Sequence, residues 1–187
     1  MEVGLRERVL AAVRARRAVD ERERRSLAEV VDAFGRLTDP FDRHADPVHV
    51  TGSGLIVGRR GIVLLRHRRL GIWVQPGGHL DAGETPWAAA RRESAEETGL
   101  TVELADVRAD GVPPLAHVDV HPGGRGHTHL DLRYLLHAAG DSDPRPPAGE
   151  SQEVGWFAWP AAIERADPAM VGVLAALAAT QQTNLRS

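Results

Sequence analysis

The sequence contains no cysteine, and this absence removes several chemistries at once. Disulfide bonds, thiolate metal sites and cysteine nucleophiles are all excluded, and cysteine usage says nothing about the redox compartment. Lysine is missing as well, so that all 23 basic residues are arginine. This bias fits a coding sequence rich in G and C, and it does not by itself indicate arginine-specific chemistry.

Long hydrophobic runs are also missing. No apolar stretch approaches the roughly 18 residues that a membrane-spanning helix needs, and the N-terminal stretch MEVGLRERVL lacks the apolar core of a signal peptide. The net charge of −3 is too close to zero to indicate a protein that binds a nucleic-acid backbone or a membrane surface. We therefore expect a cytoplasmic protein that binds neither membranes nor nucleic acids.

The length of 187 residues, of which 42% are hydrophobic, suits one domain with a buried core and a small added element. Residues 1–46 read as two helices, because their apolar residues recur at helical spacing. The two apolar stripes are Leu5, Val9, Ala12 and Val13, and then Leu27, Val30, Val31, Phe34 and Leu37. We expect a helical hairpin over residues 1–46 that packs on the domain formed by residues 47–187 or on a second copy of the chain in a homodimer.

The periodicity changes from helical to strand-like after the hairpin. Strands are expected at residues 48–58, 61–67, 72–76, 101–110, 114–121, 129–139 and 153–159, and short C-terminal helices at 160–165 and 168–180. Residues 140–150 are rich in proline, glycine and aspartate and should form a loop. Strands on both sides of one central helix predict an α/β (α+β) fold with a mixed sheet covered on both faces.

The central helix lies in the stretch from Gly77 to Leu100, GGHLDAGETPWAAARRESAEETGL. Thr85 and Pro86 form a favourable N-cap and first-turn pair, and Gly99 is suited to a left-handed helix end. At about 100° per residue, the carboxylates of this helix fall on roughly one third of its circumference. These carboxylates belong to Glu93, Glu96 and Glu97.

Three crowded carboxylates repel one another unless a cation neutralises them. Mg²⁺ prefers oxygen ligands and is commonly held by one or two carboxylates together with substrate phosphates. Arg92 adds a guanidinium that can fork onto a neighbouring carboxylate and fix its rotamer. The residues alone therefore predict a phosphate-binding Mg²⁺ site on a helix, with a glycine-rich loop facing it.

The same stretch resembles the signature of the Nudix hydrolase family, which has the form G-x5-E-x7-R-E-U-x-E-E-x-G-U, where U is aliphatic. The matching residues are Gly78, Glu84, Arg92, Glu93, Glu96, Glu97, Gly99 and Leu100. Ser94 departs from the signature, since the family usually has an aliphatic residue there. Chance occurrence of so many fixed positions is negligible, so the resemblance is specific.

The resemblance implies an α/β/α sandwich of the Nudix type and several roles. Glu93, Glu96 and Glu97, together with the backbone carbonyl of Gly77, are expected to bind the metal. Glu84 is expected to support the loop. The family often places a further carboxylate in a loop before a late strand, where it completes the metal site or activates water. Glu150 occupies such a place in this chain, and Glu153 and Asp131 are the alternatives.

Histidine and aspartate alternate along two of the expected strands, so that each set shares one face of the sheet. The first strand carries His117, Asp119 and His121, and the second carries His127, His129, Asp131 and Arg133. These side chains could contact the substrate, bind a second metal such as zinc, or form a hydrogen-bonded polar network. We interpret His117, Asp119, His129, Asp131 and Arg133 as substrate-binding residues.

The sequence therefore predicts an enzyme that uses Mg²⁺, with Mn²⁺ as a possible substitute, to hydrolyse a diphosphate linkage by metal-activated water. Its substrate would be a nucleoside diphosphate derivative, a nucleoside triphosphate or another small diphosphate. The catalytic residues would be Glu93, Glu96, Glu97, Arg92 and Glu150. Isomerases of prenyl diphosphates share the expected fold, but the resemblance would then demand a catalytic cysteine. A degenerate Nudix module that only binds nucleotides or regulates a partner is the alternative.

Overall fold

The computed structural model describes residues 4–140 and 142–184. The first three residues of the predicted hairpin region 1–46, and residues 141 and 185–187 of the predicted domain 47–187, lie outside the described part of the chain. The helices are α1 (Leu5–Ala15), α2 (Glu21–Arg36), α3 (Pro86–Thr98), α4 (Trp159–Arg165) and α5 (Val171–Asn184), with short 3-10 turns at Gly124–Gly126 and Pro168–Met170. The strands are β1 (Val48–Gly58), β2 (Gly61–Arg66), β3 (Trp73–Val74), β4 (Gly77–His79), β5 (Val102–Leu104), β6 (Leu115–Pro122), β7 (Thr128–Ala138) and β8 (Val154–Phe157).

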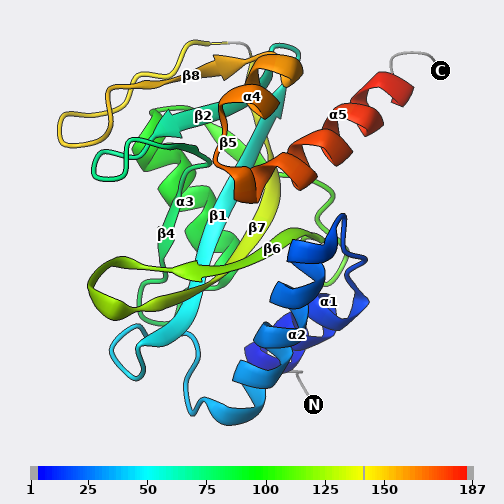
Figure 1. Cartoon of the computed structure of the whole chain (residues 1–187), viewed down its shortest axis with the longest axis vertical. Helices are drawn as coiled ribbons and strands as arrows, with labels where there is room; N and C mark the ends of the chain where they lie inside the picture. Colours follow the sequence, from blue (N-terminus) through cyan, green and yellow to red (C-terminus); the bar gives the residue numbers. More distant parts are fainter. Residues whose placement is uncertain (1–3, 141, 185–187) are drawn as a thin grey trace.

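The predicted mixed sheet is confirmed, and the long strands β1 and β7 form its centre. They pair in parallel from Val48 and Thr128 to Val57 and His137, whereas the other pairings are antiparallel. Strands β4 and β2 flank β1 on its other side, and β6 and β5 flank β7. Figure 1 shows β1 and β7 running side by side through the molecule.

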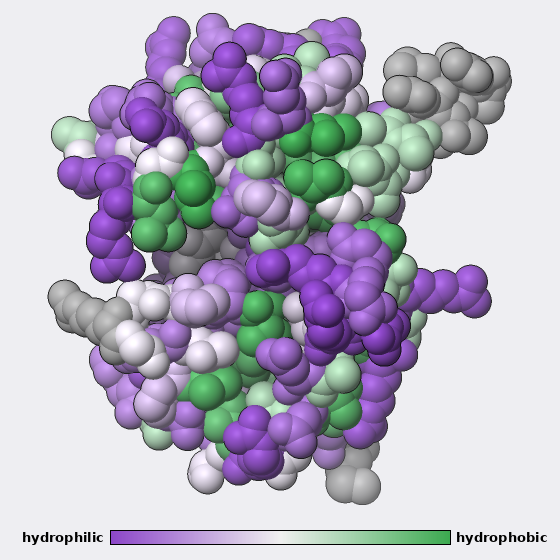
Figure 2. Space-filling view, viewed as in Figure 1, coloured by the Kyte–Doolittle hydropathy of each residue, from purple (hydrophilic) through white to green (hydrophobic). Residues whose placement is uncertain are grey.

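Alternate residues of β1 point into two different hydrophobic clusters. Val50 and Ile56 belong to one cluster with residues of α1, α2 and α3, whereas Leu55 belongs to a second cluster with residues of α4 and α5. Because neighbouring residues of a strand face opposite sides of the sheet, helices cover both faces. In Figure 1 the hairpin lies beside β6, while α4 and α5 lie near the far end of β1. Figure 2 shows apolar side chains along α5 on this face of the molecule.

The hairpin packs onto the sheet, one of the two arrangements that its apolar stripes predicted. Asp20 caps α2, since its side chain accepts a hydrogen bond from the backbone N–H of Glu23. Val30 and Phe34 are buried in the core cluster, and the Phe34 ring meets Phe41 edge-on at a centroid distance of 5.8 Å. The hairpin therefore contributes to the same hydrophobic core as α3.

Helix α2 also caps one edge of the sheet. The backbone N–H groups of Val118 and Val120 on β6 donate to the side chains of Glu23 and Ser26, each over 3.1 Å. Glu23 is fully buried and also accepts from Arg16 at 2.8 Å. The donors of this edge are thus satisfied by side chains of the hairpin.

Two local expectations were wrong. The strand expected at 101–110 ends at Leu104, because the following residues turn back and Asp106 has a positive φ of 53°. The glycine loop before α3 contains a short strand, β4, whose Gly77 and Gly78 pair with Ser53 and Gly52 of β1. Alternating side chains could not predict that strand, since its residues offer no side-chain pattern. None of the helices in the described residues has the length and apolar character needed to cross a membrane.

Truncation of Phe34 tests the packing of the hairpin. Because Phe34 is 2% exposed and belongs to the shared core, Phe34→Ala should lower the free energy of unfolding by about 3–5 kcal/mol. Urea denaturation followed by circular dichroism measures the change. The control is Leu70→Ala at a side chain that is 59% exposed, where the expected change is within about 0.5 kcal/mol. Equal small effects in both variants would mean that the hairpin does not contribute to the core.

Candidate active site

The ends of helix α3 have the geometry that the sequence predicted. The Thr85 side chain accepts a hydrogen bond from Ala88 N–H at 3.2 Å, and Pro86 occupies the first turn. Gly99 ends the helix in the left-handed conformation with φ 68°. A Cβ at Gly99 would also meet the carbonyl oxygen of Arg145 at 2.0 Å. Only glycine fits both the backbone angle and the available space.

Helix α3 approaches the sheet closely because glycines face it. A Cβ at Gly52 of β1 would lie 2.2 Å from the carbonyl oxygen of Pro86, and one at Gly54 would lie 2.0 Å from Ser94 Oγ. Ser94 is fully buried at this contact. The small side chain at the position where the family signature has an aliphatic residue therefore allows the helix to lie directly on the backbone of β1.

The backbone of β4 touches two of the three predicted metal ligands. Gly77 donates its N–H to Glu97 Oε2 at 2.8 Å. A Cβ at Gly78 would lie 2.5 Å from the Glu93 carboxylate. Glycine at position 78 thus lets the strand pass directly over the Glu93 carboxylate, whereas glycine at position 77 allows close contact with Ser53 of β1.

Arg92 links the carboxylates of the site to one another and to the loop before α3. It donates to Glu84 at 2.9 and 3.1 Å, to Glu93 at 2.8 Å and to Glu96 at 3.1 Å. A further hydrogen bond of 2.9 Å runs to the carbonyl oxygen of His79. Hydrogen bonds with Glu84 raise the pKa of Arg92, which therefore stays charged. The predicted orienting role of Arg92 and the supporting role of Glu84 agree with these contacts.

The carboxyl groups nearest β4 hold their protons more strongly than a free glutamate. Burial raises the pKa of Glu97 to about 7, and the negative charges of Glu93, Glu150 and Glu96 act in the same direction. Burial also raises the pKa of Glu93, against the opposing effect of Arg92. A cluster of oxygen donors with raised pKa values is the environment that a hard divalent cation stabilises. The donor set of α3 therefore fits Mg²⁺ or Mn²⁺.

Of the three further carboxylates considered, Glu150 contributes to the raised pKa of Glu97 through its negative charge. Glu153 is instead paired with Arg66 at 3.0 Å. Asp131 is buried and accepts hydrogen bonds from Ser53 at 2.6 Å and from Arg133 at 2.8 Å. Both alternatives are therefore engaged elsewhere.

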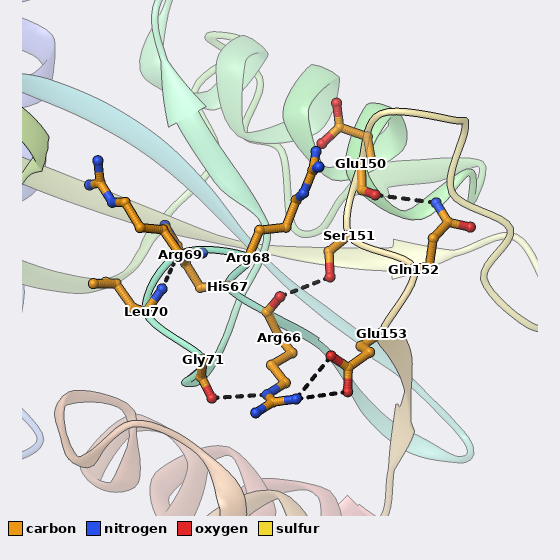
Figure 3. A pocket seen from close by; sticks show the side chains of 10 residues that line it. All are labelled: Arg66, His67, Arg68, Arg69, Leu70, Gly71, Glu150, Ser151, Gln152 and Glu153. Atoms are coloured by element: carbon orange, nitrogen blue, oxygen red, sulfur yellow. Dashed lines mark hydrogen bonds and ion pairs between the residues drawn. The ribbon is translucent and has the colours of Figure 1, made fainter.

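Glu150 also lines an open pocket of about 530 Å³. The loop after β2 forms one wall and the segment before β8 the other, and the lining residues are Arg66, His67, Arg68, Arg69, Leu70, Gly71, Glu150, Ser151, Gln152 and Glu153. Figure 3 shows the side chains of Arg68 and Glu150 extending toward the same side of this pocket. These arginines were not among the predicted site residues, although the run RHRR at 66–69 concentrates positive charge in one loop.

The alternating histidines and aspartates of β6 and β7 lie opposite one another. The register pairs His117 with Arg133, Asp119 with Asp131 and His121 with His129. The two sets therefore share one face of the sheet, as the alternation predicted.

Four of the five predicted substrate-binding residues are buried in a polar network. Arg133 donates to Asp131 at 2.8 Å and to Asp119 at 3.3 Å, and Arg22 of α2 donates to Asp119 at 2.7 Å. Burial acts to raise the pKa of Asp119, but His121, Arg22 and Arg133 outweigh it and lower this pKa. His117 is buried beside them, so these residues bond mainly with one another and their contact with a substrate stays a prediction.

His129, the fifth of these residues, is half-buried at the end of the same face. Burial lowers its pKa to about 4, which leaves the imidazole neutral at neutral pH. A neutral imidazole can accept a hydrogen bond or bind a metal.

The family model of the NUDIX domain matches residues 47–177. The chain is 39% identical over 101 residues to the "Putative 8-oxo-dGTP diphosphatase 3" of Mycobacterium tuberculosis, a match that spans 51% of this chain and 44% of that protein. It is 31% identical over 102 residues to the asymmetrical bis(5'-nucleosyl)-tetraphosphatase of Caenorhabditis elegans, covering 54% of this chain and 70% of that protein.

Solved structures share the fold. A hydrolase of the NUDIX family from Clostridium perfringens superimposes with a TM-score of 0.59 at 23% identity, over 70% of this chain and 93% of that one. The likeness therefore extends beyond α3 to the strands and helices within that 70% of the chain. At this level of identity the likeness concerns the fold alone.

The raised pKa of Glu97 predicts a pH dependence of metal binding. With a pKa of about 7, this carboxyl is largely protonated at pH 6, and a cation must displace the proton before it binds. The ionised fraction falls about tenfold between pH 8 and pH 6, so the affinity for Mg²⁺ or Mn²⁺ should fall by about the same factor. Calorimetric titration of Mn²⁺ at several pH values measures this slope.

Glu97→Gln serves as the control for this titration, because glutamine does not ionise. Its residual Mn²⁺ affinity should be weaker and should change less over the same pH range. An equally steep slope in Glu97→Gln, or tighter binding at pH 6 than at pH 8 in the unmodified protein, would contradict the assignment.

Proposed function

Because the chain belongs to the Nudix hydrolase family, we propose that it hydrolyses the diphosphate linkage of a nucleoside diphosphate derivative or a nucleoside triphosphate. The reaction requires Mg²⁺, for which Mn²⁺ can substitute. The observation that carries this proposal is the pair Glu93 and Glu97, held against the backbone of β4 with raised pKa values. Two buried carboxylates that lie close together repel each other when both are ionised, and a bound divalent cation relieves this repulsion.

The carboxylates and the arginine of α3 have different proposed roles. Glu93 and Glu97 bind the metal together with the backbone carbonyl of Gly77, and Glu96 serves as a further ligand or positions water. Glu96 is suited to that task because it is the most exposed of the three, with 55% of its side chain accessible. When bound, Mg²⁺ neutralises charge on the diphosphate and lowers the pKa of coordinated water. Arg92 keeps Glu93 and Glu96 in fixed rotamers through its hydrogen bonds.

Glu150 is proposed as the general base that accepts a proton from the attacking water. It lines the pocket and lies close enough to Glu97 to raise its pKa, whereas Glu153 is paired with Arg66 and Asp131 is buried. A general base needs an unprotonated carboxylate near the reacting water. Among the three candidates, Glu150 meets this geometric condition best.

We propose that the substrate phosphates enter the pocket beside the loop that carries Arg68 and Arg69. Both residues line the pocket, and the guanidinium of Arg68 reaches the segment before β8, where it donates to the carbonyl oxygen of Gly149 beside Glu150. Arginine is well suited to bind phosphate, because its planar guanidinium group can donate two parallel hydrogen bonds to two phosphate oxygens. The face of β6 and β7 would then recognise the remainder of the substrate through the half-buried His129, while contacts of the buried Asp131 and Arg133 with the substrate stay predictions. Two of the relatives reported above carry the names of an 8-oxo-dGTP diphosphatase and a bis(5'-nucleosyl)-tetraphosphatase, which supports a substrate of this class.

The alternative function is a degenerate module that binds nucleotides without cleaving them. Such a module does not need every carboxylate of the Nudix signature, and this chain retains all of them, namely Glu84, Glu93, Glu96 and Glu97. The location in the cytoplasm and a possible homodimer stay predictions from the sequence.

Assays on a panel of nucleotides test the proposed reaction. In the presence of Mg²⁺, one member of the panel should release phosphate, pyrophosphate or a nucleoside monophosphate. Glu97→Gln should reduce kcat/KM for that substrate at least about 100-fold, because the metal loses a charged ligand. The matched control Glu103→Gln removes a carboxylate that is 71% exposed and should leave the rate within about twofold.

Two results would count against this assignment. Activity of Glu97→Gln within about threefold of the unmodified protein at saturating Mg²⁺ would remove Glu97 from the metal site. Tight nucleotide binding without turnover of any substrate would favour the degenerate module.

A comparison of Glu150→Gln with Glu153→Gln tests the choice of general base. Glu150→Gln should lower kcat by about 10²–10⁴-fold with little change in Mg²⁺ affinity, because a general base acts on the chemical step. Glu153→Gln should stay within about threefold, since that carboxylate pairs with exposed Arg66. Steady-state kinetics at several Mg²⁺ concentrations separates the two effects. The reverse order of the two variants would assign the base to Glu153.

A further inference from the structure

Three histidines from distant parts of the chain converge at the end of the sheet where β1 begins. They are His49 on β1, His79 at the end of β4, and His127 just before β7. One ring nitrogen from each lies within 4.8 Å of the others. The ring centroid of His49 is 5.1 Å from that of His79 and also 5.1 Å from that of His127. None of these three residues is among the ligands proposed for Mg²⁺.

His49 has a nitrogen that the surrounding protein does not satisfy. The residue is fully buried, and its Nδ1 lies 3.1 Å from the carbonyl oxygen of Asp46. That carbonyl can only accept a hydrogen bond, so Nδ1 carries the proton and Nε2 presents a lone pair. Within the described residues, Nε2 has no hydrogen-bond partner. Buried polar atoms are normally bonded, so an unpaired one calls for a ligand.

The backbone holds the three histidines in place. His79 is the register partner of Thr51 on β1, and His49 is the register partner of His129 on β7, the strand that His127 precedes. A hydrogen bond from a ligating histidine to a backbone carbonyl is the usual way to orient its ring toward a metal. The contact between His49 and Asp46 has this form. From this arrangement we propose that His49, His79 and His127 bind a zinc ion at a site separate from the carboxylates of α3.

The donor atoms select the ion. Imidazole nitrogens suit zinc and related transition metals, whereas Mg²⁺ prefers oxygen. Zinc–nitrogen bonds of about 2.0–2.1 Å in a tetrahedron separate the nitrogens by about 3.4 Å. Nitrogens that already lie within 4.8 Å of one another reach this spacing by small side-chain rotations.

The neighbouring groups leave room for a fourth ligand. The His129 ring lies 5.3 Å from that of His49 and 5.1 Å from that of His79, so it borders the cluster. Arg43 is the cationic side chain that acts on both His49 and His79, and it is exposed to solvent. His79 and His127 are only partly buried, so water can reach the ion and occupy the fourth position. A site with three histidines and water is a recognised zinc arrangement.

His79 connects this cluster to the carboxylate site. Its imidazole belongs to the cluster, and its carbonyl oxygen accepts a hydrogen bond from Arg92 at 2.9 Å. Arg92 in turn holds Glu93 and Glu96. A zinc ion would tie β4 to β1 and to the start of β7, and it would thereby fix the backbone that lies over the carboxylates.

Metal analysis of the chain of residues 1–187 tests the zinc site. The protein is stripped with a chelator, dialysed against limited zinc and measured by elemental analysis, and its affinity is determined by competition with a chromogenic chelator. We expect about one zinc ion per chain. His127→Gln and His79→Gln should each weaken zinc binding at least about tenfold. Cobalt substitution should give the visible absorption of a tetrahedral nitrogen site, and His127→Gln should abolish it.

Two controls separate this site from others. His137→Gln changes an exposed histidine of β7, the strand that follows His127, and should leave zinc binding unchanged. Glu97→Gln alters the carboxylate site and should also retain zinc. His127→Gln is the primary variant because its side chain is only partly buried, and circular dichroism verifies that it folds. Zinc far below one equivalent in the unmodified protein, equal affinity in the folded histidine variants, or loss of zinc in Glu97→Gln alone would each overturn the proposal.

Discussion

The candidate site depends on the close contact between helix α3 and the backbones of β1 and β4. Gly52 and Gly54 leave no side chain between β1 and the helix, and Gly78 does the same on β4. At this separation the Glu93 and Glu97 carboxylates lie against main-chain atoms and lose much of their water. The raised pKa values of Glu93 and Glu97 therefore follow from a packing constraint and not from charge alone.

Arg92 compensates for only part of the negative charge in this contact. Its guanidinium contacts Glu84, Glu93 and Glu96, but the hydrogen-bonded partner of Glu97 is the N–H of Gly77. A single cation facing several carboxylates leaves a net negative site, which is the electrostatic condition for capturing a divalent ion. Arg92 thus fixes the positions of the carboxylates without neutralising all of their negative charge. Complete neutralisation by protein side chains would remove the attraction for metal.

The sequence predicted the helix and its carboxylates because every part of that stretch lies within one turn-and-helix segment, where spacing determines geometry. It also predicted that the helical hairpin would be buried, since the apolar stripe ending at Leu37 demands a partner. It could not reveal the histidine cluster, because His49, His79 and His127 meet only through the register of three strands. Strand β4 was missed for a related reason, as glycines pair through their backbone and show no side-chain alternation.

The cap that α2 places on β6 has a consequence for association between chains. An open strand edge offers a row of backbone donors and acceptors to any other extended segment, and such edges promote aggregation. Here Glu23 and Ser26 occupy the donors of Val118 and Val120. With these two donors occupied, the hairpin opposes pairing of β6 with a strand from another chain.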